Sequence, residues 1–170
     1  MAGTVEQHAA LRIPWLWTVG IALADQAAKF FVVTRLKPVG YVPIIPGFFN
    51  LCYVENRGAA WGMLAGRQYF LIAFSIATFA LLLWKRRQLF GALPGGGLIL
   101  ATLMGGILGN LIDRIRLGHV IDFLDFFHGL SHFPAFNVAD SAICCSVFAL
   151  LITQWVSERK AQRSSKVREC

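Results

Sequence analysis

The sequence predicts an all-α membrane protein with four transmembrane helices and a small β-element, folded as one domain over residues 1–170. Composition is the first reason: the 170 residues are 56% hydrophobic with a mean hydropathy of +0.59, whereas soluble domains have an apolar share of about 45–50%. Second, four apolar runs approach the length of about 20 residues with which a helix crosses a bilayer. Third, basic clusters follow two of these runs, as is common beside membrane spans.

Positive charge is concentrated in two places, although the formal net charge is +7. One cluster follows the second apolar run and the other lies in the C-terminal tail: Lys85, Arg86 and Arg87, then Arg159, Lys160, Arg163, Lys166 and Arg168. Because both adjoin apolar runs, we interpret them as cytoplasmic anchors and expect no nucleic-acid partner. The cysteines have no CxxC spacing and no paired histidines, so we expect no metal site.

The first predicted span covers residues 14–36 and contains two charged residues, Asp25 and Lys29. Their i and i+4 positions place them on one face of a helix. Two interpretations remain open and are compatible with each other. The residues form an ion pair that stabilises the span, or one of them reaches inward to hold a functional site.

Residues 37–67 interrupt the helical pattern with several prolines and glycines. Within them, residues 48–54 have the aromatic and aliphatic composition of a strand. The following residues 55–58 have the composition of a turn, in which Gly58 suits a positive φ. Asn56 is either a turn residue or a hydrogen-bond donor to a site. We therefore predict a small β-structure at the membrane surface.

The second and third spans are predicted at residues 68–84 and 95–114. Gly105 and Gly109 form a GxxxG pattern with Gly106 alongside, which predicts close packing of the third helix against its neighbours. After a loop at residues 115–136, the fourth span covers residues 137–156. Asn137 suits the N-cap of that helix, and Asp140 falls in its first turn.

The basic clusters also predict how the chain is oriented. Residues 1–13, 85–94 and 157–170 are placed in the cytoplasm, together with both termini, and residues 37–67 and 115–136 on the opposite side. Five basic residues depart from this rule and are interpreted as part of a functional surface: Arg35, Lys37, Arg57, Arg114 and Arg116.

Aspartates gather where the third span ends and the fourth begins, so they are expected on the same side of the membrane. Two close carboxylates share a proton, and such a pair can hydrolyse a peptide bond without a metal. Asp113 is followed by Arg114, which favours a structural ion pair, and Asp125 lies further along the loop and is expected to be exposed. Asp122 and Asp140 are favoured only weakly on these grounds. Nothing in the sequence orients Ser131 with His128 or His132 as a serine site.

Five stretches of the chain resemble the bacterial lipoprotein signal peptidase family, signal peptidase II, and occur in the order of the family motifs. They are residues 25–29 (DQAAK), 56–60 (NRGAA), 109–114 (GNLIDR), 118–123 (GHVIDF) and 136–141 (FNVADS). The one local departure is Arg57, where other members often have a small polar residue.

The resemblance implies an aspartic endopeptidase of the bacterial inner membrane with no cofactor. It implies cleavage of diacylglyceryl-modified prolipoproteins just before the lipidated cysteine, at a site facing the periplasm, with a β-cradle after the first span. Carried over by motif, the catalytic pair is Asp122 and Asp140. The supporting or substrate-binding residues are Asp25, Lys29, Asn56, Gly58, Asn110, Asp113, Arg114 and Asn137. Membrane lipids are expected partners, and we expect a monomer.

Two other classes of function are compatible with parts of the sequence. A proton- or ion-coupled carrier would use Asp25, Lys29 and Asp113 as a relay, but the second and fourth spans offer almost no charged residues to continue it. A non-catalytic membrane scaffold would use the glycine-rich third span as a packing surface and would tolerate substitution of the aspartates.

Overall fold

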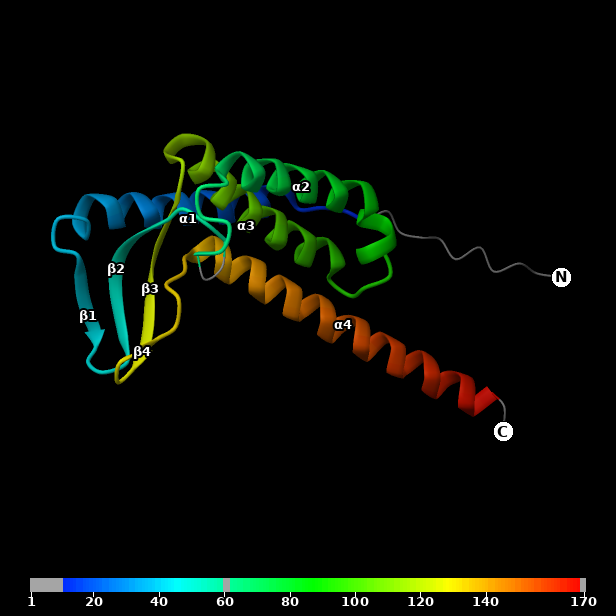
Figure 1. Cartoon of the computed structure of the whole chain (residues 1–170). Coiled ribbons are helices and arrows are strands. Elements are labelled where there is room, and N and C mark those ends of the chain that lie inside the picture. The colour runs from blue at the N-terminus through cyan, green and yellow to red at the C-terminus, as the bar shows by residue number, and fades with distance from the viewer. Residues whose placement is uncertain (1–10, 60–61, 169–170) are drawn as a thin grey trace.

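A computed structural model of the chain describes residues 11–59 and 62–168. It contains four long helices: α1 (Trp15–Arg35), α2 (Gln68–Phe90), α3 (Gly96–Leu117) and α4 (Val138–Arg168). Each includes a segment long and apolar enough to cross a membrane, which in α4 is Val138–Gln162. A small sheet lies at one end of the helices, and α4 runs out beyond the others at the opposite end (Figure 1). The prediction of four long apolar helices is confirmed, whereas residues 1–10 of the predicted N-terminal tail lie outside the described residues.

Two helices continue past the ends of the predicted spans, where basic residues follow an apolar run. The helix α2 continues through Lys85–Arg87 to Phe90, and α4 continues through the basic tail to Arg168. Lysine and arginine are good helix formers, so the backbone hydrogen bonds continue after the hydrophobic pattern has ended. A change from apolar to basic residues therefore does not mark the end of a helix in this chain.

The sheet has four antiparallel strands in the order β1 (Tyr41–Ile45), β2 (Phe49–Asn56), β3 (Val120–His128) and β4 (Ser131–His132). The all-α class is therefore too narrow, and the loop predicted at 115–136 is wrong because it supplies β3 and β4. Its aromatic and β-branched residues favour a strand, but a strand needs a partner. Here β3 pairs with β2, which is distant in the sequence.

The central helix is α3, which packs against α1 on one side and α4 on another. A Cβ on Gly105 would lie 2.8 Å from the Thr18 carbonyl oxygen of α1, and one on Gly106 would lie 2.5 Å from the Ala139 carbonyl oxygen of α4. Such contacts leave no room for a side chain, as the GxxxG pattern predicts. The glycines thus bring the backbone of α3 close to both neighbouring helices.

We expect Gly106→Ala to lower the free energy of unfolding by about 1–3 kcal/mol, the usual cost of overpacking. Its new methyl group would lie 2.5 Å from the Ala139 carbonyl oxygen, a backbone atom that cannot rotate away as the end of a side chain can. Gly20→Ala is the matched control, because a Cβ at Gly20 meets no atom within 4 Å. The test is thermal unfolding of both variants in the same detergent, and equal midpoints would contradict the close packing.

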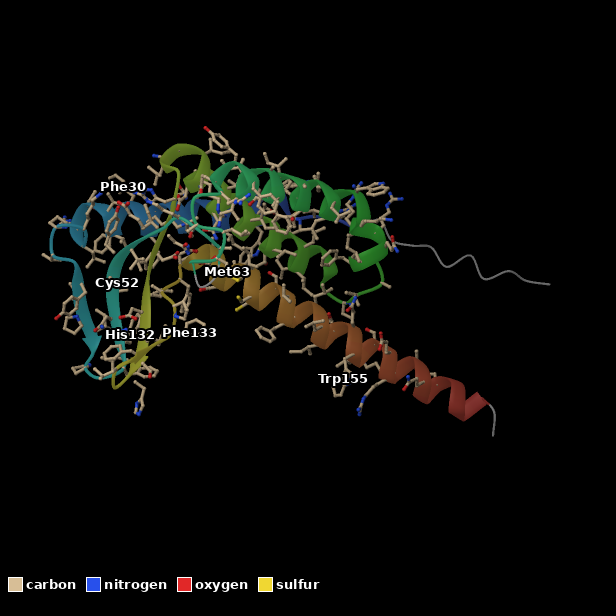
Figure 2. The ribbon with its side chains drawn as sticks, in the orientation of Figure 1. Phe30, Cys52, Met63, His132, Phe133 and Trp155 are labelled. Carbon is tan, nitrogen blue, oxygen red and sulfur yellow. The ribbon has the colours of Figure 1, made fainter. Side chains whose placement is uncertain are left out.

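Two buried apolar clusters hold these elements together. One joins α2 to α3 through Phe90, Leu100 and Met104, and the other joins α1 to β3 through Val32 and Phe123. Most other large apolar side chains are exposed, including Phe30 on α1 and Trp155 on α4 (Figure 2). This outward-facing apolar surface is expected of helices that face lipid. The α1–β3 cluster places the start of β3 beside α1.

Candidate active site

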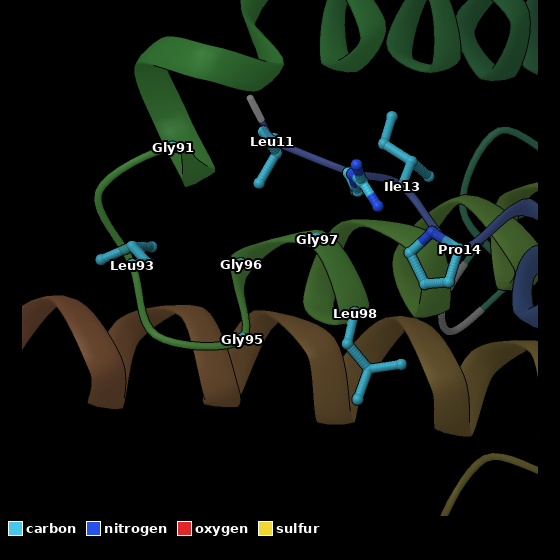
Figure 3. Close-up of a pocket in the computed structure, with 10 residues that line it drawn as sticks. Leu11, Ile13, Pro14, Gly91, Leu93, Gly95, Gly96, Gly97 and Leu98 are labelled. Carbon is cyan, nitrogen blue, oxygen red and sulfur yellow. The ribbon is translucent and has the colours of Figure 1, made fainter. Parts of the chain in front are cut away.

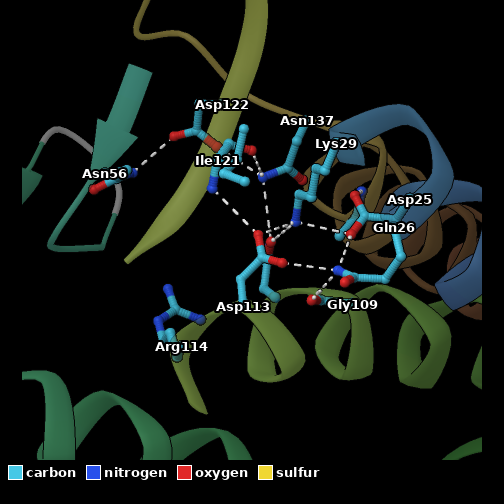
Figure 4. Close-up of polar contacts among 12 residues, drawn as sticks. Asp25, Gln26, Lys29, Asn56, Gly109, Asp113, Arg114, Ile121, Asp122 and Asn137 are labelled. Atoms are coloured by element: carbon cyan, nitrogen blue, oxygen red, sulfur yellow. Dashed lines mark hydrogen bonds and ion pairs between the residues drawn. The ribbon is translucent and has the colours of Figure 1, made fainter. Parts of the chain in front are cut away.

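A buried ion triad lies where α1 and α3 cross (Figure 4). Lys29 Nζ is 2.8 Å from Asp25 Oδ2 and 2.8 Å from Asp113 Oδ2, and it donates to Asn110 Oδ1 at 3.0 Å. The predicted pair of Asp25 with Lys29 is confirmed. The predicted pair of Asp113 with Arg114 is wrong, because successive helical residues do not face each other and Asp113 points to α1.

The two carboxylates of the triad also accept backbone hydrogen bonds from other elements. Asp25 Oδ1 accepts from the Ala139 N–H at 2.9 Å, and Asp113 Oδ2 accepts from the Ile121 N–H at 3.2 Å. Ala139 and Ile121 directly precede Asp140 and Asp122 in the chain. The triad therefore holds the backbone next to both aspartates that the family motifs single out.

Asp122 lies at the start of β3 and is only 2% exposed. Its Oδ2 accepts from Asn56 Nδ2 at 2.9 Å and its Oδ1 from Asn137 Nδ2 at 2.7 Å. Burial of the carboxyl group, followed by the negative charge of Asp140, raises the pKa of Asp122 to about 7. Asp122 can therefore hold a proton near neutral pH.

Asp140 lies in the first turn of α4, where a reciprocal capping arrangement orients it. The Asp140 N–H donates to Asn137 Oδ1 at 2.9 Å, and the Asn137 N–H donates to Asp140 Oδ2 at 3.3 Å. Asn110 Nδ2 donates to Asp140 Oδ1 at 2.7 Å. The prediction that Asn137 caps α4 is confirmed, and this fully buried residue contacts both Asp122 and Asp140. Two carboxylates, one from β3 and one from α4, thus meet around one asparagine.

Gly58 supports the site differently from the prediction. It does not have the expected positive φ, but a Cβ there would lie 2.5 Å from the Met63 carbonyl oxygen. Its N–H donates to Asn56 Oδ1 at 2.9 Å, so the amide nitrogen of Asn56 is turned toward Asp122. The glycine is required by a close backbone approach rather than by its φ.

Arg114 stands apart from the other polar contacts of the site (Figure 4). Its Nε is buried and has no hydrogen-bond partner in the part of the chain that the structure describes. Its Nη2 lies 3.5 Å from the Gly58 carbonyl oxygen, a weak contact. Burying a hydrogen-bond donor without a partner is unfavourable in free energy, which suggests a functional role for the Arg114 guanidinium.

The remaining sequence candidates lie away from this cluster, at the far end of the sheet. Asp125 accepts from Asn50 Nδ2 at 3.2 Å and is 2.8 Å from His132 Nδ1. Its side chain is only 14% exposed, so the prediction of an exposed residue is wrong. Partners on β2 and β4 cover it, and neither strand pairing was visible in the sequence.

A hollow of about 650 Å³ lies at the opposite end of α3 from the aspartates (Figure 3). Residues 11–14 and the glycine-rich segment before α3 line it. Among these lining residues the ionisable side chain is Arg12, and none carries a carboxylate. The hollow therefore offers no acid–base chemistry.

Gln26 is a polar residue of this region that was not among the predicted site residues. Its Nε2 donates to Asp113 Oδ1 at 2.8 Å and to the Gly109 carbonyl oxygen at 3.2 Å. The signal that indicates it is its place in the DQAAK stretch, next to Asp25 and three residues before Lys29. An uncharged side chain adds nothing to a charge pattern, so the sequence alone did not indicate a role for Gln26.

The site residues fall within a match to a known family. The profile of the family described as Signal peptidase (SPase) II matches residues 17–156. The lipoprotein signal peptidase of Syntrophotalea carbinolica is 44% identical over 86% of this chain and 93% of its own length. That of Shewanella piezotolerans is 39% identical over 91% of this chain and 94% of its own length. A solved structure described as a bacterial membrane enzyme superposes with a TM-score of 0.73 at 32% identity, covering 84% of this chain and 87% of that one.

Proposed function

This chain belongs to the signal peptidase II family, and we propose that Asp122 and Asp140 are the catalytic pair with which it cleaves its substrates. The chain is a multi-pass membrane protein and an aspartic endopeptidase that removes signal peptides from prolipoproteins. The observation that carries the assignment of the pair is Asn137, which contacts both carboxylates at once. We further propose that the substrate is diacylglyceryl-modified and is cut just before the lipidated cysteine.

The proposed mechanism divides acid and base roles between the two carboxylates. Asp122 carries the shared proton below pH about 7, while Asp140 is ionised and takes a proton from the attacking water. Asp122 donates its proton to the scissile carbonyl oxygen, which becomes the hydroxyl of a tetrahedral intermediate. When this collapses, Asp140 passes the proton that it took from water to the leaving amine of the cysteine. Asp122 recovers a proton from the hydroxyl, and the signal peptide leaves with a new carboxyl end. These steps need no cofactor.

The activity should fall as the pH rises through about 7, because Asp122 then loses the shared proton. The hydrogen bond from Asn56 lowers the pKa of Asp122, so Asn56→Ala should move this alkaline limb to higher pH. Asn50→Ala is the matched control, since Asn50 donates to Asp125 instead. The measurement is the pH profile of kcat/KM, and an unmoved limb in Asn56→Ala would contradict the assignment.

The remaining motif residues are proposed to support the pair. The triad of Asp25, Lys29 and Asp113 holds the backbone beside both aspartates, and Asn110 orients Asp140. Arg114 is proposed to bind the substrate, because its buried Nε has no partner among the described residues. Gly58 is proposed to shape the same region. We propose that one chain suffices, since all these contacts lie within it.

The direct test is to incubate the purified protein in lipid with a diacylated prolipoprotein and to measure the mass of the products. The proposal predicts two products, the free signal peptide and a lipoprotein that begins at the lipidated cysteine. A matched substrate without the diacylglyceryl group should remain uncut. Cleavage of both substrates at equal rates would overturn the proposed substrate class, and cleavage elsewhere would overturn the proposed bond.

We propose that the site faces the periplasm and that both termini lie in the cytoplasm. Lys85–Arg87 lie at the end of α2 remote from the sheet, as the positive-inside rule requires. Several basic residues at the sheet end have partners: Lys37 and Arg57 contact Glu55, and Arg116 contacts Gln26. In a cysteine-free background, an impermeant thiol reagent added to intact cells should label Gly47→Cys and spare Gln88→Cys. The reverse pattern would refute this orientation.

A further inference from the structure

Gln26 donates hydrogen bonds to the buried triad of Asp25, Lys29 and Asp113. Its Nε2 lies 2.8 Å from Asp113 Oδ1, 3.2 Å from the Gly109 carbonyl oxygen and 3.4 Å from Asp25 Oδ2 (Figure 4). Asp113 Oδ2 accepts from Lys29 and from the Ile121 N–H. Gln26 therefore donates to one oxygen of the Asp113 carboxylate, Oδ1, while the other oxygen, Oδ2, accepts from the backbone of β3.

The charges of the triad explain why such a donor is needed. Two carboxylates, Asp25 and Asp113, share one ammonium group in a region at most 2% exposed. A buried carboxylate oxygen without a donor is unfavourable, and a second cation in its place would add another desolvation cost. The uncharged amide of Gln26 satisfies Asp113 without changing the net charge.

Arg116 sets which way the amide of Gln26 points. Arg116 Nη1 donates to Gln26 Oε1 at 3.3 Å. Because only the oxygen of an amide accepts hydrogen bonds, this contact turns the nitrogen toward Asp113. The exposed arginine therefore holds the half-buried glutamine in the orientation in which it can donate.

We propose that Gln26 is a positioning residue for Asp122, held in place by Arg116. The path runs from Gln26 through Asp113 to the Ile121 N–H, which adjoins Asp122. Without the amide, the Asp113 carboxylate turns to find another donor and its bond to the Ile121 N–H lengthens. Asp122 then shifts relative to Asp140. This inference rests on the proposed function, because it takes Asp122 to be catalytic.

The first test replaces the amide by an apolar group of similar size. Gln26→Leu should lower kcat by about 10- to 100-fold, the scale of a misplacement near 1 Å, with little change in KM. Trp17→Phe is the matched control, since it removes another α1–α3 hydrogen bond, from Trp17 Nε1 to Thr102 Oγ1 at 2.9 Å. That control should retain the normal kcat. Rates are divided by the folded fraction of each preparation, so a loss of folding alone leaves kcat unchanged.

The second test reverses the direction of the hydrogen bond. Gln26→Glu alone places a third carboxylate against Asp113 and should lower kcat at least as much as Gln26→Leu. In the double variant Gln26→Glu/Asp113→Asn, the new amide at 113 donates to the new carboxylate at 26. Its oxygen can still accept from Lys29 and the Ile121 N–H, and the net charge is that of the normal triad. The double variant should therefore be at least several-fold faster than either single variant.

Two outcomes would overturn the positioning role. One is a normal kcat in Gln26→Leu. The other is a double variant whose kcat does not exceed the kcat of both Gln26→Glu and Asp113→Asn. Asp122→Asn in the same assay separates this inference from the proposed function. If Asp122→Asn is inactive and Gln26→Leu is normal, only the role of Gln26 fails. If Asp122→Asn is active, the proposed catalytic pair fails, and the role of Gln26 fails with it.

Discussion

Asp122→Asn and Asp140→Asn should each reduce cleavage of a diacylated prolipoprotein by roughly 10³-fold or more, since acid–base catalysis contributes about 10²–10⁴-fold. An amide is nearly the same size as a carboxyl group but neither takes nor gives a proton at ordinary pH. Each variant therefore keeps a side chain of nearly the same size and loses one of the two roles.

The surrounding amides make the loss at position 122 more severe. The oxygens of Asp122 accept from Asn56 and Asn137, whose own orientations are set by the Gly58 and Asp140 N–H groups. An amide at 122 has only one oxygen, so its nitrogen must face one of these two donors. The variant is thus expected to displace one asparagine in addition to losing the proton.

The control for this experiment is Asp125→Asn, a change of the same kind on the same strand. Asp125 contacts Asn50 and His132 at the far end of the sheet, so cleavage should be unchanged. Initial rates are measured with equal amounts of folded protein in lipid. Normal activity in either Asp122→Asn or Asp140→Asn would remove that residue from the catalytic pair.

Lys29→Met should give the largest loss of stability, about 3–5 kcal/mol in the free energy of unfolding, as when one partner of a buried ion pair is removed. The change leaves the carboxylates of Asp25 and Asp113 facing each other without the ammonium group, at 0% and 2% exposure. Asn110 Oδ1 also loses a donor. The backbone contacts at Ala139 and Ile121 should weaken with the two carboxylates that make them.

Lys37→Met provides the matched control, because Lys37 also contacts a carboxylate but lies in water. Its side chain is 53% exposed and sits 3.6 Å from Glu55. Exposed pairs of this kind contribute little to stability. Unfolding of both variants is followed in one detergent by heating or by denaturant. A loss of similar size in both variants would show that burial of the triad is not what makes Lys29 important.

Contacts between residues close in the chain were predictable from the sequence. The pair of Asp25 and Lys29 follows from their i and i+4 spacing, and the cap at Asn137 follows from its place before an apolar run. The helical period places the first pair, and the capping preference of asparagine places the second. The preference for Asp122 and Asp140 came from the family motifs, because charge and spacing did not select the pair.

Contacts between distant segments were predicted poorly. Asp113 was assigned to its neighbour Arg114, although it pairs with Lys29 on another helix. The segment containing Asp122 was predicted as a loop, although β3 pairs with β2. Gly58 was assigned a positive φ, although its role is a close approach to the Met63 carbonyl oxygen.

By itself, the sequence determined the four apolar helices and which acids and amides are available near one end of them. Helix formation and membrane insertion depend on local composition, because each helix satisfies its own backbone hydrogen bonds. Only the tertiary structure decided which of these polar groups meet. The glycines of α3 bring α1 and α4 together, and the pairing of β2 with β3 places Asn56 beside Asp122. A buried carboxylate must find its donors wherever the fold provides them, and those of Asp122 and Asp140 come from three separate parts of the chain.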